Sequence, residues 1–544
     1  MAQSQKASLV QKDNCRKAYG SLGEGNTRSS FKDSNKLSRW AGISFCYFGI
    51  FILHVQCSVY WTSMWPFLLQ VDKDVTLWFF GFVISAYSVG LFAAAPLLGY
   101  WSNRIKQTRL PIIFGIIVNM TGNLMVVFAQ SLPSGQKWML LAARLVSGLG
   151  AGAQGPIQAY VAMSSTYGER NVAMALLAAT TSMGIVVGPR LQAAFLPLGY
   201  PGAVIPPYLH FNMYTAPAFM NILLCLILIF SLLLLFKEYH IDVKDDSDPL
   251  LGLEEELPID KVAAANCIWV KFLMLYCLDY VVAIGKPYSM AMFGWSNSTA
   301  IFYNSVLLTV CGFMDFLGNI LVGTFALRFI KERNTMLFGV SVLVVVFLIT
   351  FSWPGPPNAA TGIVNPNVSN MLHTNSTLHN NWMPISLNST YASTNGADVA
   401  SCTYSWCVYT PKTAVWQFVA GFALTSVAFS FAFSTSTTLY SKIVGPRRQG
   451  TMQGIHASVG GLATSTSPII VSVLFSIYGP RVAWAAALAL VVSTIIVLLV
   501  TYKRLIPYVE MVKQKTGRNI YSEYNLNLGN VAERTGPSDS DDGQ

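Results

Sequence analysis

Charged residues are scarce in this sequence. Asp, Glu, Lys and Arg make up 11% of its 544 residues, whereas a soluble domain carries about 25%. Hydrophobic residues account for 53% and aromatic residues for 13%. This composition excludes an ordinary soluble protein and an intrinsically disordered one, and it is typical of a chain that crosses a lipid bilayer many times.

Motifs of catalysis and metal binding are missing as well. The sequence contains no nucleophile elbow, no phosphate-binding Gly-Lys-Ser/Thr loop and no metal-ligand spacing. We therefore expect no enzymatic activity, no cofactor and no bound metal. Most of the nine cysteines lie in apolar runs and indicate no disulfide framework. The first 38 residues are polar and basic, without the pattern of a cleavable signal peptide.

Long apolar runs predict twelve membrane-spanning helices, since about 20 apolar residues suffice to cross the hydrocarbon core. The runs divide into two groups of six around a polar, acidic stretch. The sequence therefore predicts an all-α membrane protein of two six-helix bundles. The predicted spans are residues 40–69, 77–100, 111–129, 138–163, 173–196, 213–236, 262–293, 299–327, 335–352, 414–440, 452–477 and 482–501.

The distribution of Lys and Arg predicts the orientation in the membrane. The loops on one side of the predicted bundles hold only Lys73, Lys137 and Lys412, while most other loop Lys and Arg residues lie on the opposite side. Cytoplasmic loops retain positive charge, so we expect the basic side and both termini in the cytosol. This asymmetry explains the net charge of +10 without a nucleic-acid partner.

The predicted organisation has five parts. They are a cytoplasmic tail (1–39), the first bundle (40–236), a cytoplasmic acidic linker (237–261), the second bundle (262–502) and a second cytoplasmic tail (503–544). Within the second bundle, the polar loop 352–413 is expected on the luminal side.

Two features of the luminal side support this topology. Sequons for N-glycosylation occur in the loop 352–413 and in the short loop before it. The same long loop contains Cys402 and Cys407, which are close enough in sequence to pair in an oxidising compartment. The four sequons are Asn297, Asn367, Asn375 and Asn388.

The loop after the second span carries GYWSNR, which runs from Gly99 to Arg104. It occupies the place of the Gly-x-x-x-Asp-Arg motif that latches the cytoplasmic face of major facilitators, and so resembles it. Asn103 stands at the acidic position, so a latch based on charge is expected to be weakened.

The fourth span contains LAARLVSGLGAG, with Arg144 inside an apolar helix and Gly148 and Gly152 one and two turns later. A charge at this depth costs several kcal/mol unless it faces a cavity or a partner. We interpret Arg144 as an anion contact; the alternative is an arginine anchored to backbone carbonyls for packing. Gln154 and Gln158, on one face of the same span, are further candidates for the transport pathway.

The fifth span contains Gly184-x-x-x-Gly188-Pro189. Two small residues on one face permit close helix approach, and the proline removes a backbone hydrogen bond. The motif resembles the hinge of the superfamily's fifth helix. Arg190 follows directly and is a second candidate cavity charge.

The seventh and eighth spans carry the remaining candidates. Asp279 and Lys286 are seven residues apart and therefore share a helix face. Asp315 is followed one turn later by Asn319. These groups are interpreted as proton or ion ligands, with a purely structural ion pair between Lys286 and an aspartate as the alternative. His54 in the first span is a weaker candidate.

An ordered series of segments marks a family. In order along the chain they are SMWPFL, ISAYSVG, GYWSN, AARLVSGLGAG, VGPRLQ, NMYTAP, WCVYTP, LYSKIVGP, GPRVAW and YKRLI. From Tyr60 to Ile506 the sequence resembles the lysosomal ceroid-lipofuscinosis family of the major facilitator superfamily. The resemblance implies a glycosylated multi-pass protein of late endosomes or lysosomes that is linked to chloride homeostasis. In the seventh span, the acidic residue that the family carries nearer Pro287 is missing, with Val282 near its position.

The acidic linker contains a sorting pattern. Asp246, Leu250 and Leu251 form an acidic dileucine motif that a clathrin adaptor recognises. The family places its dileucine in the amino-terminal tail, which has none here. The alternative is a solvated acidic linker without a sorting role.

Three functions remain compatible with the sequence. A secondary carrier would move a small solute or anion by alternating access, with protons as candidate coupling ions. An anion channel would use the same arginines to lower the electrostatic barrier of a continuous pore. A membrane scaffold would need no charge inside its spans. Buried charges argue against the scaffold, and a carrier with chloride as leading substrate is the predicted function.

Overall fold

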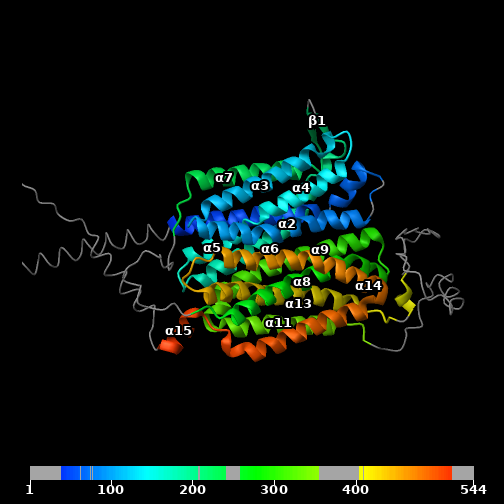
Figure 1. Cartoon of the computed structure of the whole chain (residues 1–544). Helices are drawn as coiled ribbons and strands as arrows, with labels where there is room; N and C mark the ends of the chain where they lie inside the picture. The colour runs from blue at the N-terminus through cyan, green and yellow to red at the C-terminus, as the bar shows by residue number, and fades with distance from the viewer. Residues whose placement is uncertain are drawn as a thin grey trace, which may run out of the picture.

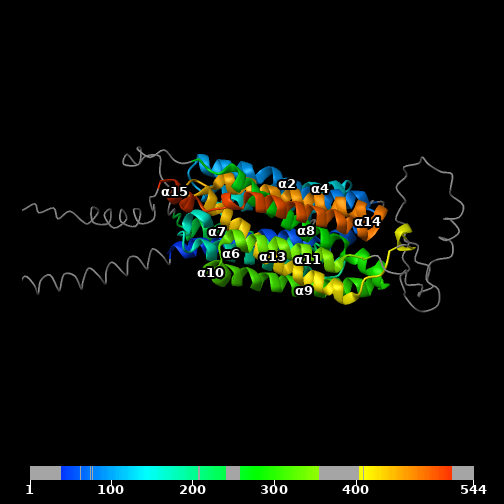
Figure 2. The same cartoon turned by 90° about the horizontal axis from the view of Figure 1, so that it is seen from below.

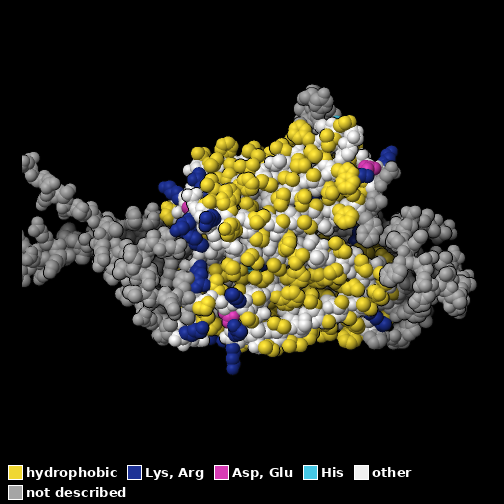
Figure 3. Space-filling view, in the orientation of Figure 1, with side chains coloured by type: hydrophobic (Ala, Val, Ile, Leu, Met, Phe, Trp, Pro, Cys, Tyr) yellow, Lys and Arg dark blue, Asp and Glu magenta, His cyan; other side chains and the backbone are white. Residues whose placement is uncertain are grey.

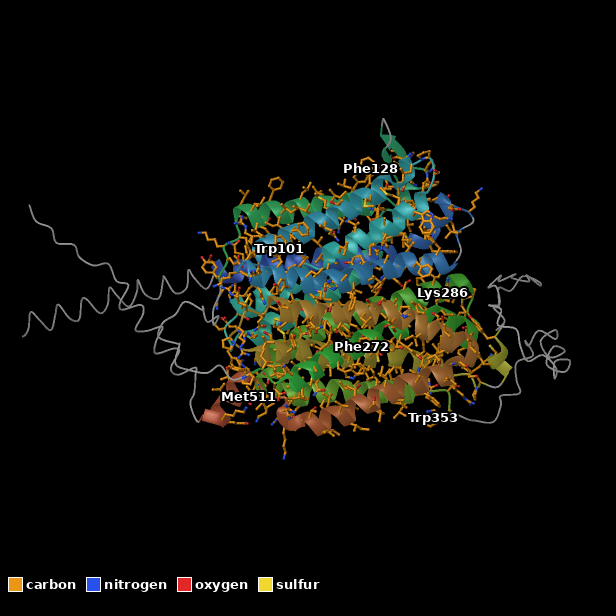
Figure 4. The ribbon with its side chains drawn as sticks, viewed as in Figure 1. Trp101, Phe128, Phe272, Lys286, Trp353 and Met511 are labelled. Carbon is orange, nitrogen blue, oxygen red and sulfur yellow. The ribbon has the colours of Figure 1, made fainter. Side chains whose placement is uncertain are left out.

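The computed structural model describes residues 38–61, 63–73, 75, 77–205, 209–239, 258–353, 404–408 and 410–516. These residues form long helices that run side by side (Figure 1). The helix that begins at Ser38 and α15 (Tyr508–Thr516) lie at the same end of the bundle (Figures 1 and 2). We call this end the tail end and the opposite end, where Trp353 lies, the loop end (Figure 4).

The helices form two bundles of six spans. The first bundle contains the helix Ser38–Trp61, α2 (Leu77–Arg104), α3 (Arg109–Phe128), α4 (Gln136–Ala151), α5 (Gln154–Ser164), α6 (Arg170–Ala194) and α7 (Ala216–Leu234). The second contains α8 (Lys261–Phe293), α9 (Asn297–Leu321), α10 (Leu327–Phe329), α11 (Glu332–Thr350), α13 (Val415–Val444) and α14 (Gly450–Thr501). A short hairpin of β1 (Ala203–Ile205) and β2 (Leu209–Phe211), not anticipated from the sequence, connects α6 to α7.

The structure is consistent with twelve membrane crossings. Among the described residues, ten helices are long and apolar enough to span a bilayer. One of them, α14, is two helices joined at a kink, where Gly479 has a φ of 80°. One further crossing is formed by α4 and α5, which a turn at residues 152–153 separates. The fourth predicted span is therefore interrupted, and the last two are continuous except for the kink.

Glycines allow the helices of the first bundle to approach closely. A Cβ at Gly148 of α4 would lie 2.1 Å from the carbonyl oxygen of Tyr87 in α2, and a Cβ at Gly90 would lie 2.5 Å from the carbonyl oxygen of Leu145. Contacts of this kind stabilise helices in lipid, where burial of apolar surface gives little driving force. The close approach places the side chain of Tyr87 beside Arg144 of α4.

The outer surface matches a bilayer. Large apolar side chains such as Leu234, Phe325 and Val500 are exposed, and apolar side chains cover the middle of the surface (Figure 3). Lys and Arg side chains gather at the tail end in the same view. Residues 1–37 and 517–544 of the two tails, most of the acidic linker and most of the loop 352–413 lie outside the described residues.

Candidate functional site

Arg144 is buried, with 1% of its surface exposed. Its guanidinium carbon lies 5.0 Å from the ring centroid of Tyr60 and 4.6 Å from that of Tyr87. Nη1 donates one long hydrogen bond, of 3.5 Å, to the carbonyl oxygen of Gln56, while Nε has no hydrogen-bond partner among the residues described. A single long contact to a carbonyl is weak anchorage for a buried arginine.

The charge of Arg144 is not balanced by a carboxylate. The guanidinium forms no ion pair with any residue that the structure describes. Each tyrosine face contributes about 0.5 to 2 kcal/mol, whereas an unpaired cation inside a membrane costs several kcal/mol. An anion beside Arg144 would supply the missing charge. Tyr60 and Tyr87 were not predicted as partners of Arg144, because tyrosines are common in apolar runs.

Arg144 faces the boundary between the two bundles. Its charge lies within electrostatic range of Cys57, which is also within electrostatic range of Asp279 in α8. Cys57 belongs to the first bundle and Asp279 to the second. The predicted arginine and the predicted aspartate therefore lie on the two sides of one boundary.

The alternative prediction, a structural ion pair between Lys286 and an aspartate, is wrong. Neither Lys286 nor Asp279 nor Asp315 pairs with an opposite charge among the described residues. Asp279 and Lys286 are seven positions apart, which corresponds to about 10 Å along α8 and is too far for contact. Lys286 is exposed and lies toward the loop end (Figure 4).

Asp315 is held by neutral donors from both bundles. Ser182 of α6 donates to its Oδ2, while Ser430 of α13 donates to its Oδ1 over 2.7 Å. Asn319, one turn along α9, donates to the same Oδ1 over 3.1 Å. A Cβ at Gly318 would lie 2.4 Å from Ser430 Oγ, so glycine is needed there for the approach. The structure thus brings Asp315 and Asn319 together and adds Ser182 across the boundary.

Gln154 and Gln158 belong to a second polar group. The Gln154 amide nitrogen lies 3.5 Å from His54 Nε2, while the Oε1 atom of Gln158 is buried and finds no hydrogen-bond partner in the part of the chain that the structure describes. Across the boundary, Lys271 lies within electrostatic range of His54 and is 3.1 Å from Nδ1 of His456. Sequence analysis missed Lys271 and His456, although a lysine within an apolar span is itself a signal.

The tail end of the boundary is closed by glycine and asparagine. A Cβ at Gly99 of α2 would lie 2.2 Å from the carbonyl oxygen of Gly450 in α14. Asn103 accepts a hydrogen bond of 2.8 Å from the Gly450 N–H and donates one of 2.9 Å to Thr451 Oγ1. Its amide also donates to the carbonyl oxygen of Arg448 over 3.4 Å. Asn103 was expected to weaken a latch based on charge. The structure shows that neutral hydrogen bonds from Asn103 to α14 make the contact between the bundles at this position.

Further junctions join the bundles, one at the tail end and one nearer the middle. Thr464 of α14 donates to Ser88 Oγ of α2 over 2.9 Å, and Asn171 of α6 donates to the carbonyl oxygen of Leu327 over 3.3 Å. Arg104, by contrast, is exposed at the end of α2.

The glycines of the fifth span pack against the first helix. A Cβ at Gly184 would lie 2.7 Å from His54 Cβ, and a Cβ at Gly188 would lie 2.0 Å from Ser58 Oγ. Pro189 lies within α6 and removes one of its backbone hydrogen bonds. Arg190 is exposed and donates to the carbonyl oxygen of Val186 on its own helix, so it is not brought to Arg144.

The remaining predicted residues lie at the edge of the described structure or outside it. Asn297 begins α9 at the loop end. Cys407 is disulfide-bonded. Outside the described residues are Cys402, Asn367, Asn375, Asn388, Asp246, Leu250 and Leu251.

A family profile and a relative with a similar sequence both place the chain in the same family. A family profile described as Major Facilitator Superfamily matches residues 46–380 and 397–526. A relative from Xenopus laevis, Major facilitator superfamily domain-containing protein 8, is 31% identical over 486 residues, which are 87% of this chain and 92% of the relative.

Solved structures share the architecture at low sequence identity. The human organic anion transporter MFSD10 aligns with a TM-score of 0.55 and 16% identity, covering 85% of this chain and 99% of that one. The proton:xylose symporter XylE aligns with a TM-score of 0.56 and 11% identity, covering 87% and 97%. The predicted all-α fold of two six-helix bundles is confirmed.

Proposed function

Because the chain belongs to the major facilitator superfamily, we propose that this membrane transporter carries a small solute or anion by alternating access, with chloride as the leading candidate. The observation that carries the proposal is Arg144, a buried cation at the boundary between the bundles without a carboxylate partner. Chloride itself comes from the resemblance to the lysosomal ceroid-lipofuscinosis family. A compact anion would offset the buried charge without the large cavity that an organic substrate needs.

Each polar group has a role in this proposal. Arg144 binds the anion, and Lys286 attracts it from the loop end because its exposed ammonium is positive. Asp279 and Asp315 are the candidates for proton coupling. Asp315 also joins the bundles through Ser182, so movement of one bundle against the other would change its hydrogen bonds.

The contacts at the tail end favour a carrier over a channel. A carrier must close one face while the other is open. Gly99 meets Gly450, and Asn103 bonds across the boundary, so the tail end is shut. A channel would need a continuous pore through the same contacts, and a scaffold would need none of the buried charges.

We further propose that the protein resides in late endosomal or lysosomal membranes with its tail end in the cytosol. The family resemblance supports the location, while the gathering of Lys and Arg at the tail end supports the orientation. A clathrin adaptor that binds Asp246, Leu250 and Leu251 would provide the route. Removal of N-linked glycans should lower the mass of the protein, and replacement of all four sequon asparagines by Gln should abolish that change.

The function is tested on enlarged endolysosomes that contain the full chain. Chloride is varied on each face while both current and luminal chloride are recorded, with Arg144→Gln as the test variant. Arg328→Gln, which removes an exposed arginine at the tail end, is the matched control. We expect chloride movement that Arg144→Gln lowers about 10- to 100-fold and Arg328→Gln preserves. A current that reverses at the chloride equilibrium potential would favour a channel, and chloride movement unaffected by Arg144→Gln would contradict the role of the arginine.

A further inference from the structure

Lys271 is a second buried cation, separate from Arg144. It lies ten residues inside α8, and 3% of its surface is exposed. Its Nζ is 3.1 Å from Nδ1 of His456 and 5.8 Å from the ring centroid of Phe433. No carboxylate pairs with it among the residues that the structure describes. A lysine buried in this way lacks a counter-charge.

The contact with His456 limits the charge of the pair. At 3.1 Å one nitrogen must donate and the other must offer a lone pair, so Lys271 and His456 together hold at most one proton charge. When the ammonium donates to Nδ1, the imidazole is neutral and its Nε2 carries hydrogen. That Nε2 is fully buried and has no hydrogen-bond partner among the described residues. The ring itself is fixed by stacking on Tyr440, with centroids 4.5 Å apart. The pair therefore offers donors with no acceptor.

The first bundle completes the surroundings with polar groups. His54 lies within electrostatic range of Lys271. Its Nδ1 is 2.9 Å from the carbonyl oxygen of Ile50 and therefore donates, which leaves Nε2 to accept from Gln154 over 3.5 Å. His54 is thus a neutral neighbour. The group spans both bundles, and none of these facing side chains is negative.

This group lies at a different depth from Arg144. Arg144 lies eight residues, or about 12 Å, from the start of α4 at the loop end, whereas Lys271 lies ten residues, or about 15 Å, from the start of α8. α8 begins at the tail end, so Lys271 is nearer the closed contact of Gly99 with Gly450. An anion that leaves Arg144 toward the tail end would meet Lys271 next.

We propose that Lys271 and His456 form a second anion site, in series with Arg144, which takes a small inorganic anion of the size and charge of chloride. This inference rests on the proposed function. Lys271 supplies the charge, and the Lys271 ammonium and His456 Nε2 supply hydrogen bonds. Two weak sites in series let an ion enter from one face and leave toward the other without a single deep energy minimum.

The test is equilibrium binding of radiolabelled chloride to the purified full-length protein, with gluconate replacing chloride at constant ionic strength. We expect wild type to bind two ions per chain, and Lys271→Met and Arg144→Gln to bind one each. Lys271→Arg should retain two because it keeps the charge. His456→Phe keeps the ring stack on Tyr440 and should weaken the second site at least tenfold, so it tests the site if Lys271→Met fails to fold. Arg328→Gln is the control for loss of a surface charge.

The outcomes separate this site from the proposed function. Lys271→Met and His456→Phe proteins that still bind two ions with wild-type affinity would overturn the second site, even if Arg144→Gln abolishes transport. Loss of one ion in Lys271→Met would support the site, even if no variant, nor wild type, moves chloride across a membrane. Wild-type protein that binds a single ion, lost in Arg144→Gln, would overturn the second site as well.

Discussion

The tail end and the middle of the boundary between the bundles are built from different chemistry. At the tail end, glycine backbones touch and Asn103 exchanges hydrogen bonds with α14, so neutral partners satisfy one another. In the middle, Arg144 and Lys271 are buried cations that pair with no carboxylate of the described residues, and several buried polar atoms near them lack partners there as well. A boundary that only holds helices together needs the first kind of contact. The second kind has a cost that a bound anion would offset.

The largest expected effect comes from blocking the contact of the two backbones. Gly99→Leu places a side chain where a Cβ alone would lie 2.2 Å from the Gly450 carbonyl oxygen. The tail end should no longer close, and chloride uptake into proteoliposomes should fall to background. Gly81→Leu on the same helix is the control, because a Cβ there meets nothing within 4 Å. Equal uptake by both variants would show that closure does not depend on this contact.

The next effect concerns the buried charge. Arg144→Gln removes the cation and should lower the rate of chloride uptake about 10- to 100-fold, since a hydrogen bond to a charged group contributes about 1.5 to 3 kcal/mol. Arg144→Lys keeps the charge but loses the planar group between Tyr60 and Tyr87, so its loss should be smaller. The rates are compared in proteoliposomes at matched protein content. Arg144→Lys as inactive as Arg144→Gln would show that shape, and not charge, decides.

A moderate effect is expected from the asparagine latch. Asn103→Ala removes two well-formed hydrogen bonds across the boundary, worth about 1 to 2 kcal/mol in total. The closed tail end should lose about 5- to 30-fold in relative population. Distances between spin labels at Gln107 and Arg328, one on each bundle, would report this shift. Asn103→Asp keeps the acceptor for the Gly450 N–H and should change the distances less. Unchanged distances in Asn103→Ala would contradict the latch.

The smallest effect is expected for a residue outside the boundary, where a substitution should change stability but not transport. Asp260 caps α8 through the N–H groups of Val262 and Ala263 and pairs with Arg504 at 2.9 Å. Partial burial would raise the pKa of the Asp260 carboxyl, but the bonds from Arg504 and the two N–H groups outweigh it and hold this pKa below its usual value. Asp260→Ala should cost about 1 kcal/mol of stability and leave transport unchanged.

The pH dependence of that cost follows from the direction of the shift. The pKa of Asp260 is lower in the folded than in the unfolded chain, so the interaction stabilises the fold above the unfolded value of about 3.9 and is lost as the pH falls through the folded value. The difference in unfolding temperature between wild type and Asp260→Ala should be constant near neutral pH and shrink on acidification. A difference that grows on acidification would contradict the assignment.

The fold was predictable from the sequence because a membrane-spanning helix can be recognised from the composition of a short segment. Apolar runs located the spans, and the scarcity of charge made Arg144 and Asp315 conspicuous. The pairings were not predictable, because they join distant segments. Asn103 meets the Gly450 N–H, which is 347 residues away, and Lys271 meets His456 across 185 residues. Knowing the identity of Asn103 without its partners led to the expectation of a weakened latch.

The ion pair offered for Lys286 failed for a related reason. Residues seven apart share a helix face but differ by about 10 Å in height, so a shared face does not imply contact. The aromatic partners of Arg144 were also not predictable from the sequence. Tyr60 and Tyr87 come from two other helices, and the glycines that bring them close predict the approach without naming the residues that meet.

The most direct test of the central claim is counterflow of radiolabelled chloride into proteoliposomes loaded with unlabelled chloride. A carrier that alternates between its faces and binds the anion at Arg144 predicts a transient accumulation of label in wild type and in Arg328→Gln, and an accumulation about 10- to 100-fold slower in Arg144→Gln. Accumulation at the wild-type rate in folded, correctly inserted Arg144→Gln protein would contradict the claim, as would the absence of accumulation from wild type.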